Sequence, residues 1–155
     1  MYVEQDSERE RLRRGLINFL TTGRGIAFNT MLGMTEYPKD ILPVYAQGYT
    51  ASAYLIDVRS QAAEPKKHFV EFVSRFMGVD KFTTNYCKYN DNDLNPKGDW
   101  SRSLKKCYEC MKDTSEWQIE WLEWVKSSFQ STELGSAEDF DFTPLAERCC
   151  GHKLR

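Results

Sequence analysis

Signals that end and begin helices recur at short intervals along this chain, and no stretch between them alternates as a β-strand would. Thr21-Thr22-Gly23 follows an apolar-periodic segment, and a glycine at this position favours the left-handed conformation that ends a helix. Tyr37-Pro38 and Gly78 stop two further apolar segments. The sequence therefore predicts an all-α fold with about five helices in a compact, bundle-like arrangement.

Helical boundaries follow from the spacing of apolar residues and from capping patterns. Ser7 to Glu10 and Ser115 to Gln118 match the capping box, and Asp40 and Asp99 are predicted N-caps. Glu64-Pro65 begins a helix, since proline suits a first helical turn. The predicted helices cover residues 7–21, 40–56, 64–77, 99–111 and 115–129, with one further helical turn within 26–34.

Domain organisation is predicted from the distribution of apolar residues. Residues 1–129 are expected to form one helical subdomain, interrupted by an irregular loop over 79–98 that is rich in Asn, Asp and Lys. Residues 130–155 are poor in apolar side chains, and we expect a loosely held C-terminal tail there.

Charge and hydropathy exclude two classes of partner. The net charge is −2, so no general affinity for nucleic acid or for an anionic membrane is expected. No run of 18 apolar residues exists, and the charged N-terminus lacks the apolar segment of a secretory signal. We expect no membrane insertion, and the compartment is not assigned by these features.

Five cysteines are present, and an odd number argues against a closed disulfide framework. We expect reduced thiols, which favours a cytoplasmic location. Cys107 and Cys110 form a CxxC pattern inside a predicted helix, so core packing is the preferred interpretation. A structural zinc site completed by Cys149, Cys150 and His152, or a redox role, remains the alternative.

Catalytic zinc chemistry of the HExxH type needs two histidines one helical turn apart, with a glutamate between them to activate water. The chain has only His68 and His152, and the residues from His68 read H-F-V-E-F. His68 is therefore predicted to be a half-exposed helical residue. We expect no metal ligands and no cofactor in this chain.

Aromatic residues dominate two predicted helices. Trp117, Trp121 and Trp124 are expected to be core residues that pack on the helix at 40–56 or at 64–77, with a partner surface as the alternative. Tyr45 and Tyr49 are also expected in the core, whereas Gln47 lies about 160° away from each on a regular helix. Gly48 would let another backbone approach this helix closely.

The chain resembles the C-terminal half of the peptidase MA-like (gluzincin-like) zinc metallopeptidases of planctomycete bacteria. The resemblance covers most of the chain, and its specific part is YP at 37–38 followed by YAQGY at 45–49. The matching stretches are VEQDSER (3–9), LINFLTTGRGIAFNTMLGMTEYP (16–38), DILPVYAQGYTASAYLID (40–57), KHFVEFV (67–73), DW (99–100) and EWLEWVKSS (120–128).

The resemblance implies that an HExxH helix and a W-x-D-E-G-type segment precede the equivalent of Val3, and this chain contains neither. It implies a truncated, non-catalytic helical portion whose partner is the missing N-terminal catalytic part or another protein. Zinc is then expected only in a full-length relative. Tyr45 is the candidate donor to an oxyanion, and Tyr49, Gln47, Trp117, Trp121 and Trp124 are candidate substrate-side or interaction residues. The alternative is a self-contained α-helical interaction or structural module.

Overall fold

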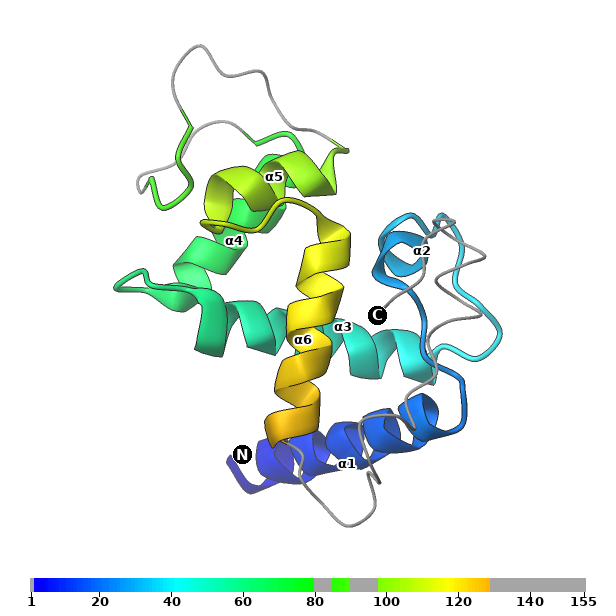
Figure 1. Cartoon of the computed structure of the whole chain (residues 1–155). Coiled ribbons are helices and arrows are strands. Elements are labelled where there is room, and N and C mark those ends of the chain that lie inside the picture. Colours follow the sequence, from blue (N-terminus) through cyan, green and yellow to red (C-terminus); the bar gives the residue numbers. More distant parts are fainter. Residues whose placement is uncertain (1, 80–84, 90–97, 129–155) are drawn as a thin grey trace. The chain divides into compact units, whose positions relative to one another are not determined.

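The structure, a computed structural model, describes residues 2–79, 85–89 and 98–128, and it confirms the all-α fold (Figure 1). Over these residues the chain forms helices and no strand. The helices are α1 (Tyr2–Thr21), α2 (Phe28–Leu32), α3 (Leu42–Tyr54), α4 (Pro65–Phe76), α5 (Trp100–Cys107) and α6 (Thr114–Ser128), and a π-helical turn, η1 (Leu55–Arg59), follows α3 directly. Predicted features of the tail at 130–155 lie outside the described residues.

The chain divides into two units, which are described separately. The first comprises residues 1–51 and 118–155, and the second comprises residues 52–117, so the boundaries fall inside α3 and inside α6. The single helical subdomain over residues 1–129 stays a prediction.

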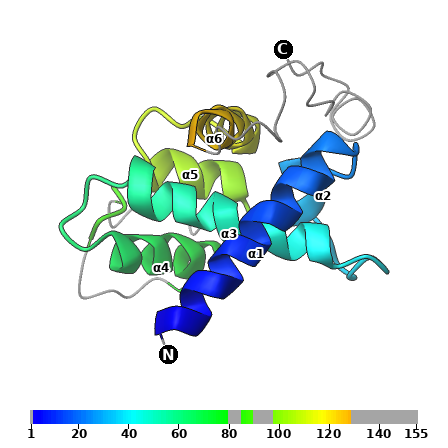
Figure 2. The ribbon, with the colours of Figure 1, turned by 90° about the horizontal axis from the view of Figure 1, so that it is seen from below.

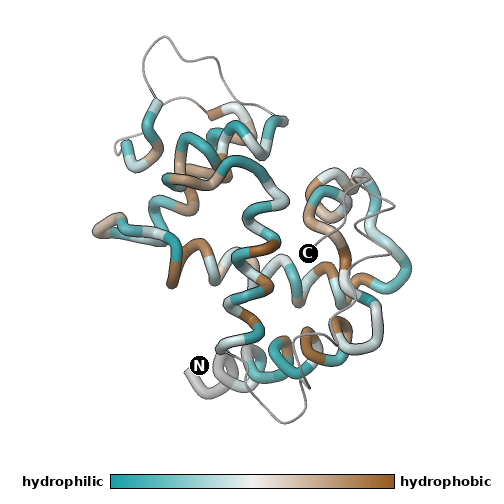
Figure 3. The backbone as a smooth tube through the Cα atoms, viewed as in Figure 1, coloured by the Kyte–Doolittle hydropathy of each residue, from teal (hydrophilic) through white to brown (hydrophobic). Residues whose placement is uncertain are grey.

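The first unit buries apolar residues of α1, α2, α3 and α6 together with three polar residues. Hydrophobic and hydrophilic positions interleave along α1 and α6, as expected of helices that bury one face (Figure 3). The buried residues are Leu16, Ile17, Phe19, Leu20, Ala27, Phe28, Ala46, Gln47, Thr50, Ala51, Gln118, Trp121 and Val125.

The turn after α1 confirms the predicted helix end. Gly23 has φ +70°, and the N–H of Arg24 donates to the carbonyl of Phe19 over 2.7 Å, as in a left-handed C-cap. The guanidinium of Arg24 lies 4.7 Å from the Phe19 ring centroid and pairs with Asp40. Because α3 begins at Leu42, Asp40 lies two residues before the helix, and its predicted role as an N-cap is wrong.

In the second unit, α4 packs on α5 and on η1, and the two views show α4 and α5 side by side (Figures 1 and 2). Phe72 is at the centre, with edge-on contacts to Tyr108 and Trp117 at centroid distances of 5.5 and 6.2 Å. Trp100 stacks on Phe76 at 3.6 Å.

The capping residues in the structure show where the predicted helix starts are right and where they differ. Asp99 caps α5 as expected, since its carboxylate accepts from the N–H of Arg102 over 3.0 Å. The cap of α6 lies at Asp113, two residues before the predicted cap at Ser115, because Asp113 accepts from the N–H of Glu116 and Glu116 reaches back to the N–H of Lys112. At α1 the helix begins before the predicted cap at Ser7, where no Gly or Pro interrupts it.

Helix α4 buries only part of its apolar side chains. Phe72 is buried, but Val70 and Met77 are 60% and 67% exposed, while His68 and Glu71 are buried. Glu71 accepts from the N–H of Cys87 over 2.9 Å and pairs with Arg75 at 3.2 Å. A buried carboxylate with these partners occupies a core position that the apolar pattern assigns to hydrophobic residues.

Replacing Glu71 by Ala should destabilise the protein by about 3–5 kcal/mol, because it leaves the buried N–H of Cys87 and the guanidinium of Arg75 without their carboxylate. Urea unfolding followed by circular dichroism measures the change. The matched control is Glu64→Ala at the N-cap of the same helix, where the exposed pair of Glu64 with Lys67 contributes at most about 1 kcal/mol. Equal losses in the two variants would contradict the structural role given to Glu71.

Candidate functional site

One face of α3 carries Leu42, Tyr45, Gly48 and Tyr49, which lie within about 120° of one another at helical spacing; we call it the tyrosine face. Leu42, Tyr45 and Tyr49 are 51%, 53% and 41% exposed. The predicted core role of the two tyrosines is therefore wrong. A Cβ added at Gly48 would meet no atom of the described residues within 4 Å, so the close backbone approach expected there is not made by this part of the chain.

Gln47 is the residue that orients α3, and it is fully buried. Its side-chain oxygen accepts from the N–H of Ile26 over 2.6 Å, and its amide nitrogen donates to the carbonyl of Ile26 over 2.7 Å. The single amide thereby pairs both backbone groups of one residue in the non-helical segment before α2. The sequence correctly predicted that Gln47 lies opposite the tyrosines, but it missed this anchoring role.

The same side of α3 packs closely on α6. The indole N–H of Trp121 donates to the hydroxyl of Thr50 over 3.2 Å, and Trp121 lies 5.1 Å from Phe28, centroid to centroid. Gln118 accepts from the N–H of Phe28 over 2.7 Å. The small residues Ala46, Thr50 and Ala51 were the available sequence signal for this side, since they allow helices to approach closely.

Two of the three tryptophans of α6, Trp117 and Trp121, are core residues as predicted. Trp117 contacts Phe72 of α4, and Trp121 contacts Thr50 of α3, so the expected packing on those two helices is confirmed. Trp117 and Trp121 are buried and Trp124 is half-buried. Trp117 and Trp121 therefore offer little accessible area for the alternative role as an interaction surface, whereas Tyr45 and Tyr49 of the tyrosine face are exposed.

His68 in the second unit is only 5% exposed, so its predicted half-exposure is wrong. Its Nε2 lies 2.7 Å from the carbonyl oxygen of Cys107 and must donate to it, because a carbonyl only accepts. Its Nδ1, 2.7 Å from the hydroxyl of Ser60, then accepts. Burial lowers the pKa of the imidazole, partly offset by the bond to Cys107 and the charge of Glu71, so the ring is neutral at pH 7.

The cysteines also differ from the prediction. Cys87 and Cys107 form a disulfide, whereas Cys110 is a free, exposed thiol. The expectation of reduced thiols is therefore wrong for this pair. The odd number of cysteines argued against a closed disulfide framework. It did not exclude a single disulfide beside a free thiol, which is the arrangement in this unit. Cys149 and Cys150 lie outside the described residues.

Within residues 2–79, 85–89 and 98–128, no three His, Cys, Asp or Glu side chains cluster in a way that could hold a metal ion. The two cysteines of the CxxC pattern do not act as a pair, because Cys107 is bonded to Cys87. Over the same residues, no helix is both long and apolar enough for a membrane crossing.

Replacing Gln47 by Leu should destabilise the protein by about 2–4 kcal/mol, because the N–H and C=O of Ile26 both lose their partner. Denaturant unfolding measures the loss. The control is Tyr49→Leu on the exposed side of the same helix, expected to change stability by less than about 0.5 kcal/mol. A Gln47→Leu variant as stable as the parent would show that the two hydrogen bonds between Gln47 and Ile26 do not contribute to stability.

The stability of the protein should fall as the pH drops below about 6.5, because the unfolded His68 takes up a proton there while the buried ring resists it. The slope from this residue is at most about 1.4 kcal/mol per pH unit. Urea unfolding at several pH values, with the parent compared with His68→Gln, isolates the contribution. Identical pH profiles of the two proteins would contradict it.

Comparison with protein-family models, with curated proteins and with solved structures finds no match to this chain.

Proposed function

We propose that this chain is the helical, non-catalytic portion of a zinc-metallopeptidase-like protein, in which residues outside the chain supply the metal site. The proposal starts from the resemblance of residues 3–128 to peptidase MA-like proteins. Its most specific part, Tyr45 to Tyr49, lies on α3. The chain's own role would be to cover the substrate side of the active site.

The observation that carries the proposal is the exposure of the tyrosine face. Leu42, Tyr45 and Tyr49 follow the spacing of a buried helix face, yet each is more than 40% exposed. Contiguous exposed apolar side chains are characteristic of surfaces that another part covers. Gly48 adds open space beside Tyr45, which suits a closely approaching backbone.

The opposite side of α3 supports the same proposal. Gln47 binds Ile26, and Thr50 accepts from Trp121, so the helix cannot rotate to bury its tyrosines without breaking buried hydrogen bonds. The tyrosine face is thus held outward by the packing behind it. A docking surface needs this fixed presentation.

Tyr45 would be the residue that contributes to the reaction. A phenol held at the surface of a fixed helix is a hydrogen-bond donor that can reach a substrate bound against that helix. In peptide hydrolysis such a donor would stabilise the oxyanion of the tetrahedral intermediate, while the zinc ion and its glutamate activate water. Tyr49, one turn away, would contact substrate without donating to the oxyanion.

The alternative is a self-contained helical module that binds another protein through the tyrosine face. The same exposure favours it, and the two proposals differ in what covers the face. The coding sequence immediately upstream of Met1 separates them: an in-frame HExxH supports the peptidase, and an in-frame stop codon supports the module. Zinc-dependent, chelator-sensitive peptide hydrolysis by the 155-residue chain alone would refute its non-catalytic role.

In the full-length protein, replacing Tyr45 by Phe should lower kcat for peptide hydrolysis by about 10²–10³, with KM little changed, because only the transition state loses a donor. Tyr49→Phe is the matched control and should keep kcat within about twofold. Zinc content by elemental analysis should be equal in all three proteins. A Tyr45→Phe enzyme with parental kcat would remove Tyr45 from the mechanism.

A further inference from the structure

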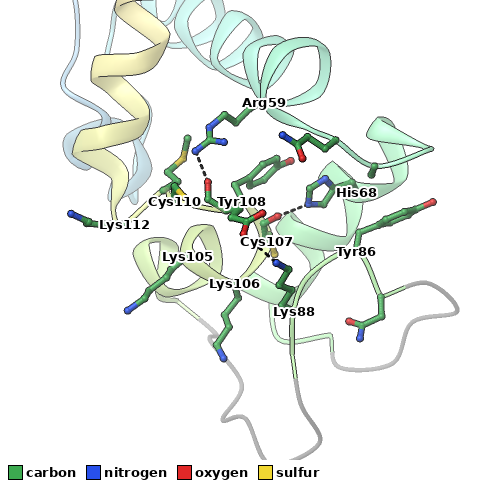
Figure 4. A pocket seen from close by; sticks show the side chains of 15 residues that line it. Arg59, His68, Tyr86, Lys88, Lys105, Lys106, Cys107, Tyr108, Cys110 and Lys112 are labelled. Atoms are coloured by element: carbon green, nitrogen blue, oxygen red, sulfur yellow. Dashed lines mark hydrogen bonds and ion pairs between the residues drawn. The ribbon is translucent and has the colours of Figure 1, made fainter.

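The second unit contains a cavity of about 650 Å³ beside His68, which we call the His68 pocket (Figure 4). Its walls come from η1, from α4, from the segment at 85–88 and from α5 with the residues that follow it to Lys112. The volume lies within the range of about 300–1,000 Å³ that is typical of sites for small organic molecules. The pocket is separate from the tyrosine face and does not depend on the proposed peptidase.

The lining of the His68 pocket is strongly cationic. Five lining side chains carry positive charge and one, Glu109, carries negative charge. The chain as a whole has a net charge of −2, so this local excess of positive charge opposes the overall balance. The cationic residues are Arg59, Lys88, Lys105, Lys106 and Lys112. A concave surface of one sign concentrates ligands of the opposite sign.

An unpaired hydroxyl lies in the same wall. Tyr108 is 1% exposed, and its hydroxyl has no hydrogen-bond partner among the described residues. The ring stacks on His68 at a centroid distance of 4.4 Å, and Figure 4 shows it between Arg59 and His68. A buried donor without an acceptor is rare in folded proteins and is relieved when a ligand supplies the acceptor.

The protonation states in the wall are suited to an anion. Burial raises the pKa of Tyr108 far above its usual value, so the phenol keeps its proton and remains a donor. The two ring nitrogens of His68 are already bonded to Ser60 and Cys107, which leaves the phenol as the wall group that needs an acceptor. At the rim, Lys105 is exposed, while Lys88 and Lys112 form exposed, weak pairs with Glu109 and Glu116 at 3.6 and 3.9 Å. These lysines supply charge without fixed geometry.

We propose that the His68 pocket binds a small organic polyanion, whose carboxylate or phosphate groups meet the lysines at the rim while one acceptor oxygen receives the hydrogen bond of Tyr108. The cavity is too large for a single inorganic anion to fill, and five cations match more than one negative group. The ligand class is therefore a molecule with two or more anionic groups.

Isothermal titration calorimetry of the full chain tests this with two probes, citrate for carboxylates and pyrophosphate for phosphates. One-site saturable binding that weakens as salt is raised is expected for at least one probe, and the tighter probe identifies the anionic group. Absence of saturable binding by both probes at millimolar concentration would overturn the proposal.

Two variants locate the binding. Tyr108→Phe should weaken it about threefold to tenfold, since one hydrogen bond is lost, and its unfolding midpoint should match the parent because the hydroxyl has no partner to lose. Lys105→Glu should weaken it about fivefold. Lys39→Glu makes the same charge change outside the pocket and should leave affinity within about twofold.

Equal weakening by Lys39→Glu and Lys105→Glu would mean that the anion responds only to overall charge, and it would overturn the assignment to this pocket. Parental affinity in a folded Tyr108→Phe protein would overturn the proposed hydrogen bond from the Tyr108 hydroxyl to the anion. If Tyr108→Phe does not fold, the comparison of the two lysine variants, both at exposed positions, still decides.

Discussion

Buried backbone groups at helix ends and between helices are the constraint on which this structure depends. The interior of a helix pairs its own N–H and C=O groups, but helix ends and connecting segments do not, and unpaired groups in a core are costly. Here helical side chains supply the partners. Gln47 binds both groups of Ile26, Gln118 binds the N–H of Phe28, and Glu71 binds the N–H of Cys87. His68 does the same for the carbonyl of Cys107.

This arrangement decides which side of each helix faces inward. On α3, Gln47 must turn toward Ile26, so the tyrosines on the opposite side remain exposed. On α4, His68 and Glu71 take core positions, and Val70 is displaced to the surface. The polar residues thus override the apolar periodicity, because a lost buried hydrogen bond to a charged or amide group outweighs partial exposure of one apolar side chain.

The two candidate surfaces of the protein differ in chemistry. The tyrosine face is apolar and exposed, and its physical requirement is to be covered. The His68 pocket is concave and cationic, and its requirement is an acceptor for a buried phenol. The first belongs to the unit that holds Gln47 and Trp121, and the second to the unit stapled by the Cys87–Cys107 disulfide. The proposed functions of the two surfaces can therefore be tested independently.

The sequence by itself determined the elements that rest on local chemistry. Gly23 and Gly78 end helices through positive φ, Asp99 begins α5, Pro65 begins α4, and the tryptophan spacing of α6 predicts its core face. Each of these depends on contacts within one helical turn or on side-chain volume, which sequence spacing encodes. The all-α class follows from them.

Only the tertiary structure decided the roles of Gln47, His68, Glu71 and Tyr108, and the pairing of Cys87 with Cys107. The backbone groups that Gln47, Glu71 and His68 bind, and the cysteine bonded to Cys87, lie 16 to 39 residues away along the chain, so no local pattern identifies them. A buried polar residue looks like a surface residue in a sequence until the backbone group that it must satisfy is known. For the same reason, the spacing of Tyr45 and Tyr49 predicted core residues, and only the hydrogen bonds of Gln47 to Ile26 explain why the tyrosines are exposed.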